Sequence, residues 1–498
     1  MKILSAAQMR EADAYTILHK PVTSIDLMER AAAACAGRIA ELTPYHSAYL
    51  IFCGKGNNGG DGLAIARLLI GMKRRVSVFV IEHSTGYSSD FSVNLKRLEG
   101  LNPQIHFVKA VSEITIAKQE NTFIIDALLG TGLNRPAEGI LAECIALINN
   151  SGLPVMSVDI PSGLPCDEKP KGSAIIKAAK TLTFQRPKLS FLLSDAAPYV
   201  SDFEILDIGL DEKFMEEQAS DFRFFHPEDA RALLKPRAKF SHKGSYGHAL
   251  LLAGSAGKAG AAILAARACL RSGAGLLTVH LPAACVNPMQ AALPEAMVHA
   301  DDEAGVISSL PKNKTYSAIG MGPGVGTAKE TAQALKLLIQ NAAAPLVLDA
   351  DALNLLAENK TWLAFLPPMT ILTPHPKEFD RLCGAHTSGF DRLETARSFA
   401  QKNTIIVVLK GAYTAVVLPD KKVFFNSSGN PALAKGGSGD VLTGMILGLL
   451  AQDYSPEKAA LLAVFVHGHA ADLYVTNQSP QAMLAGDLIE LLPRAFLL

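Results

Sequence analysis

Short apolar runs alternate with stretches of helical periodicity over the first 210 residues of the chain. Residues 4–41 predict two helices that are separated at Pro21. Six apolar runs follow, each of a length typical of a buried strand: 48–53, 76–81, 122–126, 155–160, 181–184 and 203–208. Helical stretches lie between the earlier runs. This alternation predicts a parallel or mostly parallel sheet that is covered by helices on both faces.

The same alternation starts afresh at Ser241. The predicted strands are 248–253, 276–280, 317–321, 345–349, 370–372 and 405–410, followed by a hairpin of 412–418 and 423–425. The last third is predicted to be nearly all helix, over 438–450, 455–476 and 483–492. The predicted fold class is therefore α/β, with two three-layer α/β/α domains, of which the first is Rossmann-like.

The most charged stretch of the chain, 211–240, separates the two patterns and contains two prolines. Such a composition is typical of a connection between domains. A chain of 498 residues is also too long for one ordinary hydrophobic core. We therefore expect one domain over 1–215 and a second over 225–498.

Composition excludes several classes of protein. The chain is 49% hydrophobic and contains 39 Gly and 27 Pro, as a globular α/β enzyme does. Lys plus Arg and Asp plus Glu both number 47, so no charge excess indicates a nucleic acid or an acidic membrane as partner. Seven scattered cysteines without a CxxC pair predict reduced thiols in a cytoplasmic protein. No apolar run approaches the ~20 residues of a membrane span, and the N-terminus does not read as a signal peptide.

A phosphate-binding pattern lies in the stretch 429–446, GNPALAKGGSGDVLTGMI. Gly436, Gly437 and Gly439 allow backbone N–H groups to converge, and the apolar helix that follows brings its positive end to the same point. Asp440 would be repelled by a bound anion, so proton abstraction from a substrate hydroxyl is its natural task. The alternative is a Gly-rich turn in which Asp440 caps the helix.

A second glycine-rich turn, GKGNNGGDG at 54–62, follows the first predicted strand. It contains a literal GxGxxG, and Glu82 ends the next strand at a spacing typical of a dinucleotide site. The match is weak, because four polar side chains occupy positions that a plain pyrophosphate turn leaves small or apolar: Lys55, Asn57, Asn58 and Asp61. Such side chains favour direct contacts to a substrate and an ion.

Polar groups also end two other predicted strands of the first half. Asn58 and Asp61, Asp126, and Asp159 with Ser162 follow three strands that should deliver them to one edge of a parallel sheet. Each residue alone is more often a cap or turn residue. Together they indicate a site, and oxygen ligands without Cys or His suit a hard cation or a polar ligand rather than zinc.

Five polar or glycine-rich motifs follow successive strands or precede a helix in the second half: 322–326, 349–354, 373–379, 410–414 and 429–440. Their order indicates one shared crevice at the carboxyl edge of a sheet. The segment GSAGK at 254–258 is not a P-loop, because Ala259 stands where Ser or Thr should bind magnesium.

The first-half motifs GKGNNGGDG, DALLGTGLNRP and VDIPSG resemble the epimerase domain of the bifunctional NAD(P)H-hydrate repair enzymes. That family interconverts the R and S epimers of hydrated NADH and NADPH. The resemblance implies that Asp159 contacts the substrate and acts as its acid–base, and that K⁺ is bound by Asn58, Asp126 and Ser162. The implied substrate-binding residues are Asn57, Asn58, Gly59, Gly60, Asp61, Gly130, Thr131, Gly132, Leu133, Asn134, Arg135, Pro136 and Asp159.

The second-half series GxGxG, LDADALN, LTPHPKEF, LKGAYT and NPALAKGGSGD resembles the ribokinase-like superfamily, and within it the NAD(P)H-hydrate dehydratases. It implies phosphorylation of the S-epimer hydroxyl by ADP (ATP in eukaryotic members) with Mg²⁺, followed by loss of phosphate, so that AMP and phosphate are released. The implied substrate contacts are Gly324, His375 and the catalytic Asp440. The implied nucleotide-binding residues are Lys410, Gly411, Ala412, Tyr413, Thr414, Asn430, Lys435, Gly436, Gly437, Ser438 and Gly439.

Two alternatives stay open at this point. The second domain could be a ribokinase-like kinase for another small molecule, since a glycine-rich loop followed by Asp440 serves both chemistries. The first domain could be a non-catalytic binding module. His467 and His469 are expected to be structural, because residues two apart on a helix point in different directions. A homo-oligomer is expected, since relatives commonly assemble.

Overall fold

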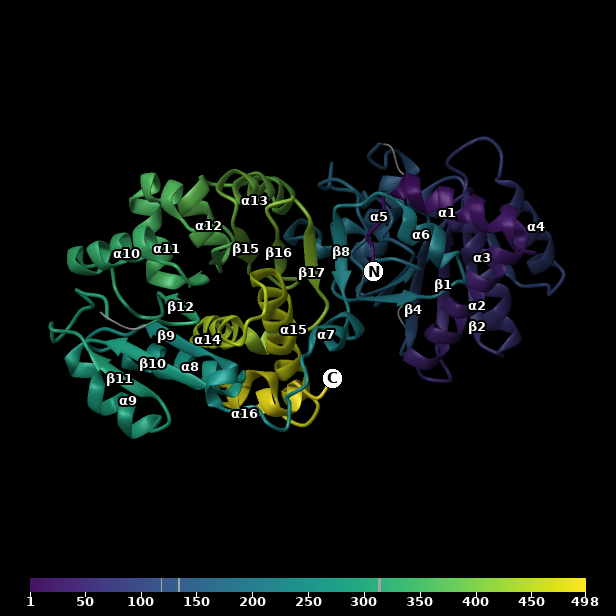
Figure 1. Cartoon of the computed structure of the whole chain (residues 1–498). Coiled ribbons are helices and arrows are strands. Elements are labelled where there is room, and N and C mark those ends of the chain that lie inside the picture. The colour runs from purple at the N-terminus through teal and green to yellow at the C-terminus, as the bar shows by residue number, and fades with distance from the viewer. Residues whose placement is uncertain (118, 133–134, 312–314) are drawn as a thin grey trace. The chain divides into compact units, whose positions relative to one another are not determined.

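A computed structural model describes residues 1–117, 119–132, 135–311 and 315–498 (Figure 1). The chain forms two compact units. Unit 1 contains residues 1–220 with 388–390, and unit 2 contains the remainder from Asp221. The division falls inside the charged stretch 211–240. In the described part of the chain, no helix is both long and apolar enough to cross a membrane.

Unit 1 is built on a seven-stranded sheet in which every neighbouring pair of strands is parallel. The strand order is β3-β2-β1-β4-β5-β6-β7, which is the Rossmann order with one strand added. The strands are β1 Ala48–Cys53, β2 Arg75–Ile81, β3 Gln104–Val108, β4 Thr122–Ala127, β5 Val155–Val158, β6 Lys180–Phe184 and β7 Phe203–Leu206. The order of connection reverses between β1 and β4, and a crevice forms at such a switch point.

Helices cover both faces of this sheet. They are α1 Ala6–His19, α2 Ser24–Leu42, α3 Asn57–Gly71, α4 Ser89–Glu99, α5 Ile140–Asn150 and α6 Glu212–Glu217. Ile51 and Cys53 of β1 join the apolar cluster with α1 to α4, whereas Phe52 joins the cluster with α5. This alternation along a strand gives three layers, as the sequence predicts. The predicted helix break also holds, since α1 ends at His19 and Thr23 caps α2.

Unit 2 contains a ten-stranded sheet in the order β11-β10-β9-β12-β13-β14-β15-β16-β17-β8. Its strands are β8 Phe222–Phe225, β9 His248–Leu252, β10 Leu276–Leu281, β11 Met297–Ala300, β12 Ala318–Met321, β13 Leu346–Leu348, β14 Ile371–Leu372, β15 Ile406–Leu409, β16 Ala415–Val417 and β17 Val423–Asn426. Only the pairs β15–β16 and β16–β17 are antiparallel, as the predicted hairpin requires. A switch point lies between β9 and β12.

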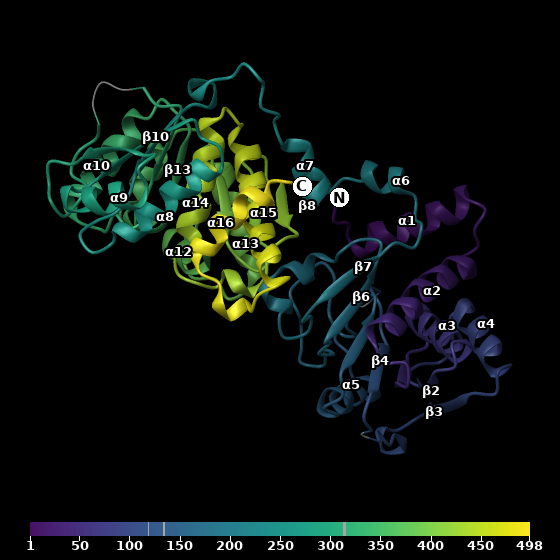
Figure 2. The ribbon, with the colours of Figure 1, turned by 90° about the horizontal axis from the view of Figure 1, so that it is seen from below.

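Ten α-helices of the described residues belong to this part of the chain. They are α7 Pro227–Leu233, α8 Ala259–Arg271, α9 Val286–Ala292, α10 Lys329–Asn341, α11 Ala350–Glu358, α12 Pro376–Cys383, α13 Gly389–Asn403, α14 Ser438–Ala451, α15 Pro456–Val475 and α16 Ala485–Ala495. Figures 1 and 2 both show α14, α15 and α16 grouped together, and each of them contacts the next. The prediction of a mainly helical last third is confirmed.

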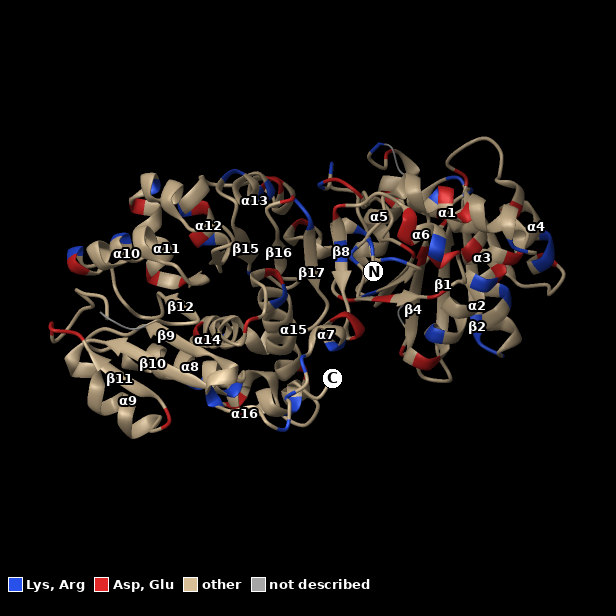
Figure 3. Cartoon of the chain, in the orientation of Figure 1, with Lys and Arg blue, Asp and Glu red and all other residues tan. Residues whose placement is uncertain are grey.

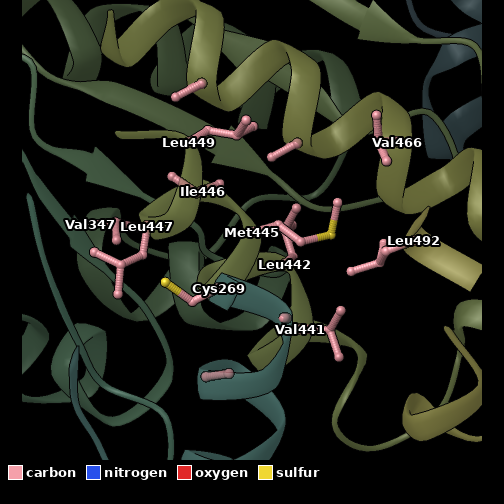
Figure 4. Close-up of a cluster of buried hydrophobic side chains, with 14 of the residues drawn as sticks. Cys269, Val347, Val441, Leu442, Met445, Ile446, Leu447, Leu449, Val466 and Leu492 are labelled. Carbon is pink, nitrogen blue, oxygen red and sulfur yellow. The ribbon is translucent and has the colours of Figure 1, made fainter. Parts of the chain in front are cut away.

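Helix α14 lies at the centre of the unit 2 core. Every residue from 441 to 451 is buried, and side chains of α8, α15, α16 and β13 gather around it (Figure 4). Two glycines bring α14 against α8. A Cβ on Gly444 would lie 2.0 Å from the carbonyl oxygen of Ala265, and one on Gly448 would lie 2.4 Å from that of Cys269. The close helix contact fixes the position at which α14 begins.

Three strands of the structure are absent from the sequence-based prediction: β3, β8 and β11. All three lie at an edge of their sheet. An edge strand needs fewer buried side chains, and β3 (QIHFV) and β11 (MVHA) accordingly mix polar and exposed residues. The strand β8 lies within the charged stretch 211–240, where it pairs with β17 in parallel.

Candidate active sites

The turn between β1 and α3 is packed too closely for side chains other than glycine at three positions. A Cβ on Gly54 would lie 1.9 Å from the carbonyl oxygen of Leu128, and one on Gly59 would lie 1.9 Å from that of Gly54. A Cβ on Gly62 would lie 2.7 Å from the Cβ of Ala127. The first turn of α3, which has no side-chain cap, is therefore held directly against the ends of β1 and β4. This is the switch point of unit 1.

The buried Lys55 and the half-buried Glu82 form an ion pair beside this turn. Lys55 Nζ lies 2.8 Å from Glu82 Oε2 and donates to the carbonyl of Ser84 at 2.6 Å. The Tyr87 hydroxyl donates to Glu82 Oε1 at 2.6 Å. Burial opposes ionisation, but the hydrogen bonds from Lys55 and Tyr87 lower the pKa of Glu82. Because both carboxylate oxygens have protein partners, Glu82 is not arranged as the free ribose ligand of a dinucleotide fingerprint.

Asp126 at the end of β4 is fully buried and accepts four hydrogen bonds. The donors are the Ser162 hydroxyl at 2.5 Å, the Ser162 amide at 2.9 Å, the Ser157 hydroxyl at 2.7 Å and the Leu128 amide at 3.3 Å. Burial raises the pKa of Asp126, and these hydrogen bonds oppose the rise. The carboxyl group is thus embedded in a complete polar shell.

The three residues expected to bind K⁺ come together around the backbone of Leu129. Asn58 Nδ2 donates to the carbonyl of Leu129 at 3.0 Å, and the amide of Leu129 donates to Ser162 Oγ at 2.8 Å. Asp126 is joined to this group through Ser162. Within the ranges that the structure describes, no three or more His, Cys, Asp or Glu side chains are grouped as a metal site. The cluster therefore offers one carboxylate and neutral oxygens, which is a donor set for a weakly charged hard cation.

Asp159 follows β5 with a backbone φ of +63°, a left-handed conformation that is uncommon outside glycine. Strained backbone of this kind is concentrated at functional sites. Asp159 Oδ1 accepts from the amide of Phe184 at 3.0 Å and from Lys188 Nζ at 2.7 Å. The lysine follows β6, and its side chain is 4% exposed.

Two further carboxyl groups act electrostatically on this pair. Burial, followed by the charges of Asp159 and Asp13, raises the pKa of Asp61 well above its ordinary value. Burial and the charge of Asp159 raise the pKa of Asp13 to about 6, against the opposing charge of Lys188. The helices α1 and α3 thus each contribute a carboxyl group beside the ends of β5 and β6.

The expected substrate loop after β4 is only partly described. Gly130 lies against Asn58, since a Cβ on Gly130 would be 3.2 Å from the Asn58 Cβ. Thr131 is half-buried, and Gly132, Arg135 and Pro136 are exposed. Leu133 and Asn134 lie outside the described residues. The structure therefore brings the start of this loop to the 57–61 turn.

In unit 2, the helix α14 begins at the glycine-rich loop. Its N-cap is Gly437, which has a left-handed φ of +90° and provides no side-chain cap. A Cβ there would lie 2.7 Å from Leu264. The position therefore requires glycine both for its backbone conformation and for lack of space. A Cβ on Gly439 would lie 3.4 Å from Lys410 Nζ. An uncapped helix N-terminus with an ammonium group over its first turn is suited to bind a phosphate.

The ammonium group of Lys410 is held by a buried carboxylate. Lys410 Nζ lies 3.0 Å from Asp349 Oδ1 and 3.9 Å from Glu378 Oε2. Asp349 is 1% exposed, and its Oδ2 accepts from the Thr443 hydroxyl of α14 at 2.7 Å. The ends of β13 and β15 are in this way tied to the first turns of α14.

Asp440 lies in the first turn of α14. Burial, followed by the charge of Asp349, raises the pKa of Asp440 to about 7; Lys410 opposes the rise and Asp351 adds to it. A carboxylate with such a pKa is suited to take a proton near neutral pH.

His375 after β14 is fixed by the helix that it caps. Its Nδ1 accepts from the amides of Lys377 and Glu378 at 3.1 and 3.3 Å, and its own amide donates to the Glu378 carboxylate at 2.8 Å. Burial and the charge of Lys410 lower the pKa of His375, against the charge of Glu378. Since Nδ1 accepts, the neutral ring carries its proton on Nε2.

Gly324 lies in the loop after β12, with a φ of +64°. A Cβ there would lie 3.1 Å from the carbonyl oxygen of Lys258, and the Gly324 carbonyl accepts from the Ser255 hydroxyl at 2.7 Å. The loops after β9 and β12 therefore meet at the switch point of the sheet.

The remaining predicted nucleotide residues are not all gathered at α14. The Thr414 hydroxyl and the backbone of Gly411 hydrogen-bond each other in one tight turn, in which Ala412 is exposed and Tyr413 half-buried. Asn430 Nδ2 donates to Asp472 at 2.9 Å, so this side chain holds the loop. The Ser438 hydroxyl donates to the backbone carbonyl of Leu433, while Lys435 and Gly436 are exposed.

Four residues of these sites are absent from the sequence-based prediction: Asp13, Lys188, Thr443 and Asp472. Asp349 belongs to the predicted 349–354 motif, but the sequence gives it no role. Lys188 has a usable signal, since it follows a strand whose neighbours end in site residues. His467, expected to be structural, is buried, and its Nε2 hydrogen-bonds the Ser438 carbonyl at 2.9 Å. It therefore supports the start of α14.

Two family models match this chain. Residues 249–494 match NAD(P)H-hydrate dehydratase, and residues 24–190 match the N-terminus of YjeF-related proteins. A crystal structure of the ADP/ATP-dependent NAD(P)H-hydrate dehydratase from Bacillus subtilis, co-crystallised with ATP and Mg²⁺, is 38% identical. The match covers 56% of this chain and 98% of the chain in that crystal structure, with a TM-score of 0.50.

Full-length relatives match both parts together. The bifunctional NAD(P)H-hydrate repair enzyme of Moorella thermoacetica is 35% identical over 99% of this chain and 96% of its own length. That of Escherichia coli is 33% identical over 95% of this chain and 90% of its own length. With two family models matched on one chain and full-length similarity to such enzymes, this protein belongs to the family of bifunctional NAD(P)H-hydrate repair enzymes.

Proposed function

We propose that this protein repairs hydrated NADH and NADPH in two reactions. Unit 1 interconverts the R and S epimers, and unit 2 removes water from the S epimer at the expense of ADP. The observation that carries the proposal is the start of α14, where Lys410 lies over an uncapped helix N-terminus and Asp440 has a pKa raised to about 7. Phosphate binding and proton abstraction are thereby combined at one point.

In the dehydratase reaction, Asp440 takes the proton of the substrate hydroxyl as that oxygen attacks the terminal phosphorus of ADP. AMP leaves, and the Lys410 ammonium and the N–H groups of α14 balance the phosphate charge. The phosphorylated oxygen then departs as phosphate with loss of a neighbouring ring proton, which restores the reduced cofactor. Phosphorylation is useful here because hydroxide is a poor leaving group.

Mg²⁺ fits this site as a partner of the nucleotide. It binds phosphate oxygens and water with one or two carboxylates, and does not need a cage of protein ligands. Asp349 is engaged by Lys410 and Thr443. Asp351 is half-buried and would be the protein ligand, through the oxygen Oδ1 that accepts from Asn354 at 3.3 Å. Its other oxygen, Oδ2, is held by Lys258 Nζ at 3.3 Å and by the Gly326 amide at 2.8 Å. When bound, Mg²⁺ would neutralise phosphate charge. The ATP and Mg²⁺ of the Bacillus subtilis crystal support this assignment.

In unit 1, the substrate would lie against the 57–61 turn and the start of the loop after β4. Asp159 would act as acid–base at the hydrated ring carbon. Potassium would be held by Asn58, Asp126 and Ser162, whose single carboxylate and neutral oxygens fit a monovalent ion. It would fix the Leu129 backbone that joins this cluster to the substrate loop.

An absorbance assay tests the proposed dehydration. The purified chain is mixed with the S epimer of hydrated NADH, Mg²⁺ and either ADP or ATP, and the absorbance band of reduced nicotinamide is followed. We expect the band to return with ADP. A flat trace with both nucleotides, together with phosphorylation of another small alcohol, would support the kinase alternative instead.

We also propose that the protein is a cytoplasmic homo-oligomer. Its seven free thiols suit that compartment. Light scattering of the purified chain checks the assembly state.

A further inference from the structure

Asp61, Asp13 and Asp159 act electrostatically on one another, with Lys188 beside them, and the proposed reaction has so far used only Asp159 as an acid–base. Asp61 lies in the first turn of α3, Asp13 lies on α1, and Lys188 follows β6. Lys188 Nζ binds Asp159 Oδ1 at 2.7 Å and lies 3.4 Å from each of two backbone carbonyls of its own loop. The lysine is thus committed to one carboxyl group of the three.

Asp61 and Asp13 are placed differently from Asp159. Within the described part of the chain, neither side chain forms an ion pair or a hydrogen bond. The backbone on either side of Asp61 is closely packed. A Cβ on Gly60 would lie 3.0 Å from Met28, and one on Gly62 would lie 2.7 Å from Cys53 Sγ. The helix turn therefore keeps a half-buried carboxyl group beside the Asp159–Lys188 pair.

We propose that Asp61 is the proton donor and Asp159 the proton acceptor of the epimerase reaction, and that Lys188 is the positioning residue that holds Asp159. The inference rests on the proposed epimerase function of unit 1. It assigns separate tasks to two carboxyl groups that face one substrate. Environments that separate two carboxyl groups in this way are a general device of acid–base catalysis.

The charges around Asp61 support its role as donor. Burial raises the pKa of Asp61 well above its ordinary value, and the charges of Asp159, Asp13 and Asp90 raise it further. No positive charge is among the causes of this shift. Two buried thiols also face Asp61 and are uncharged, since burial raises their pKa: Cys35 and Cys53. Asp61 therefore retains its proton at a pH at which an ordinary aspartate has lost it.

The chemical step conserves protons. Asp61 gives its proton to the hydroxyl oxygen at the hydrated ring carbon, the C–O bond breaks, and the oxygen leaves as water with the bonding pair. The ring nitrogen lone pair stabilises the resulting planar cation. Water then adds to the opposite face and loses a proton to Asp159. Transfer of that proton from Asp159 back to Asp61 restores both carboxyl groups.

Substitution of the donor tests the assignment in the full-length protein. Interconversion of R- and S-hydrated NADH is followed by chromatography without nucleotide. We expect Asp61→Asn to lower kcat by about 10²- to 10⁴-fold, with KM changed by less than about threefold. An unchanged melting transition of unit 1 is the folding control, and dehydration of the pure S epimer with ADP, which takes place in unit 2, should also be unchanged. If the wild type interconverts the epimers and Asp61→Asn does so at the same rate, the inference is overturned and the proposed function stands. If the wild type does not interconvert them, the proposed function is overturned.

The lysine is tested by a conservative pair of variants. Lys188→Met removes the ammonium group and should lower kcat at least about tenfold, whereas Lys188→Arg should restore much of the lost rate, because a cation again faces Asp159. Equal rates for the two variants would contradict a positioning role.

The pH profile provides a readout that a purely structural role would not move. Interconversion needs protonated Asp61, so its rate should fall as pH rises through the raised pKa of that group. Asp13→Asn removes a negative charge that raises this pKa, so the alkaline limb should move to lower pH. Glu11→Gln, on the exposed side of α1, is the matched control and should leave the limb in place. An unmoved limb in Asp13→Asn would overturn the assignment of Asp61.

Isotope exchange tests the step itself. In ¹⁸O-labelled water, each inversion through loss and addition of water should place one labelled oxygen on the ring carbon. Mass spectrometry of the product epimer measures this. Inversion without label would overturn the proposed loss of water.

Discussion

At the scale of single residues, Asp126 and Asp440 show how one kind of side chain is adapted to two tasks. Burial raises the pKa of both carboxyl groups. Asp126 accepts four hydrogen bonds from its own unit, so its oxygens are engaged before any ligand arrives. Asp440 is instead surrounded by the charges of Asp349, Asp351 and Lys410. The first arrangement fixes the carboxylate in one orientation, as a ligand requires, and the second leaves a base available.

Asp440→Asn should lower the rate of dehydration by about 10³-fold, because proton abstraction is lost while the glycines and Lys410 that bind phosphate remain. Nucleotide affinity, measured by calorimetry, should change by less than about threefold. An unchanged rate of dehydration, or a lost rate that is explained by lost ADP binding, would contradict the role given to Asp440.

The dehydration rate should also depend on pH through Asp440. Its pKa is raised to about 7, and the group must be ionised to accept a proton. We therefore expect kcat/KM for the S epimer to fall tenfold per pH unit below about pH 7. Asp351→Asn removes one like charge as well as the proposed Mg²⁺ ligand, so at saturating Mg²⁺ it should move this acid limb to lower pH. A limb that stays in place would show that another group controls the reaction.

The potassium assignment can be tested by stability. Asp126→Asn removes the charge that four donors share and should cost about 1.5–3 kcal/mol of unfolding free energy. It should also abolish any rise in the melting temperature of unit 1 when KCl replaces LiCl. Ser157→Ala, which removes one donor but no proposed ligand, should retain the potassium effect. Equal behaviour of the two variants would argue against the site.

The sequence predicts those site residues that directly follow strands, since parallel strands deliver their ends to one edge. Asp126, Asp159 and Lys410 are of this kind. It does not predict Asp13, which lies on a helix before the first strand and reaches the site only through packing in three dimensions. Nor does it show that Lys188 faces Asp159, 29 residues earlier in the chain.

At the scale of elements, Gly444 and Gly448 of α14 account for the placement of the phosphate site. Ordinary side chains would separate α14 from α8, because a Cβ at either glycine would overlap a backbone carbonyl. The helix is apolar on all sides, so its hydrophobic pattern alone identifies a buried helix but not which neighbour it touches. The sequence therefore predicts the helix α14, but it does not predict that α14 contacts α8.

Gly444→Ala should destabilise unit 2 by at least about 1–3 kcal/mol, because the added methyl group would lie 2.0 Å from a carbonyl oxygen. Gly486→Ala in α16 is the control, since nothing lies within 4 Å of its Cβ position. It should be neutral or stabilise the helix by about 0.5–1 kcal/mol. Chemical denaturation of both variants measures the difference, and equal midpoints would contradict the close helix contact.

At the scale of the whole molecule, two α/β units each provide a switch point with polar loops on either side. Basic and acidic side chains are interspersed over both units (Figure 3), in keeping with equal numbers of positive and negative residues. The similarity of the two sheet orders explains why one alternating pattern in the sequence predicts both. The sequence does not predict the edge strands β3 and β11, because few of their side chains are buried, or β8, because it lies within the charged stretch 211–240.

Calorimetry should separate the two units. ADP with Mg²⁺ is expected to bind unit 2 alone, and at 100 times its Kd it should stabilise that unit by about 2.7 kcal/mol. One of two melting transitions should therefore move to higher temperature. The same shift should persist in Asp159→Asn, whose altered residue lies in unit 1. Equal shifts of both transitions would contradict separate nucleotide binding.

The strand β8 has a consequence for synthesis of the chain. Its residues 222–225 are among the first of unit 2 to leave the ribosome, yet their partner β17 comes about 200 residues later. At about 5–20 residues per second, the nascent segment waits roughly 10–40 s for that partner. Unit 1 has all of its strands by then. Residues 222–225 should therefore be protected from a protease only after translation passes residue 426, whereas the 48–53 strand is already shielded.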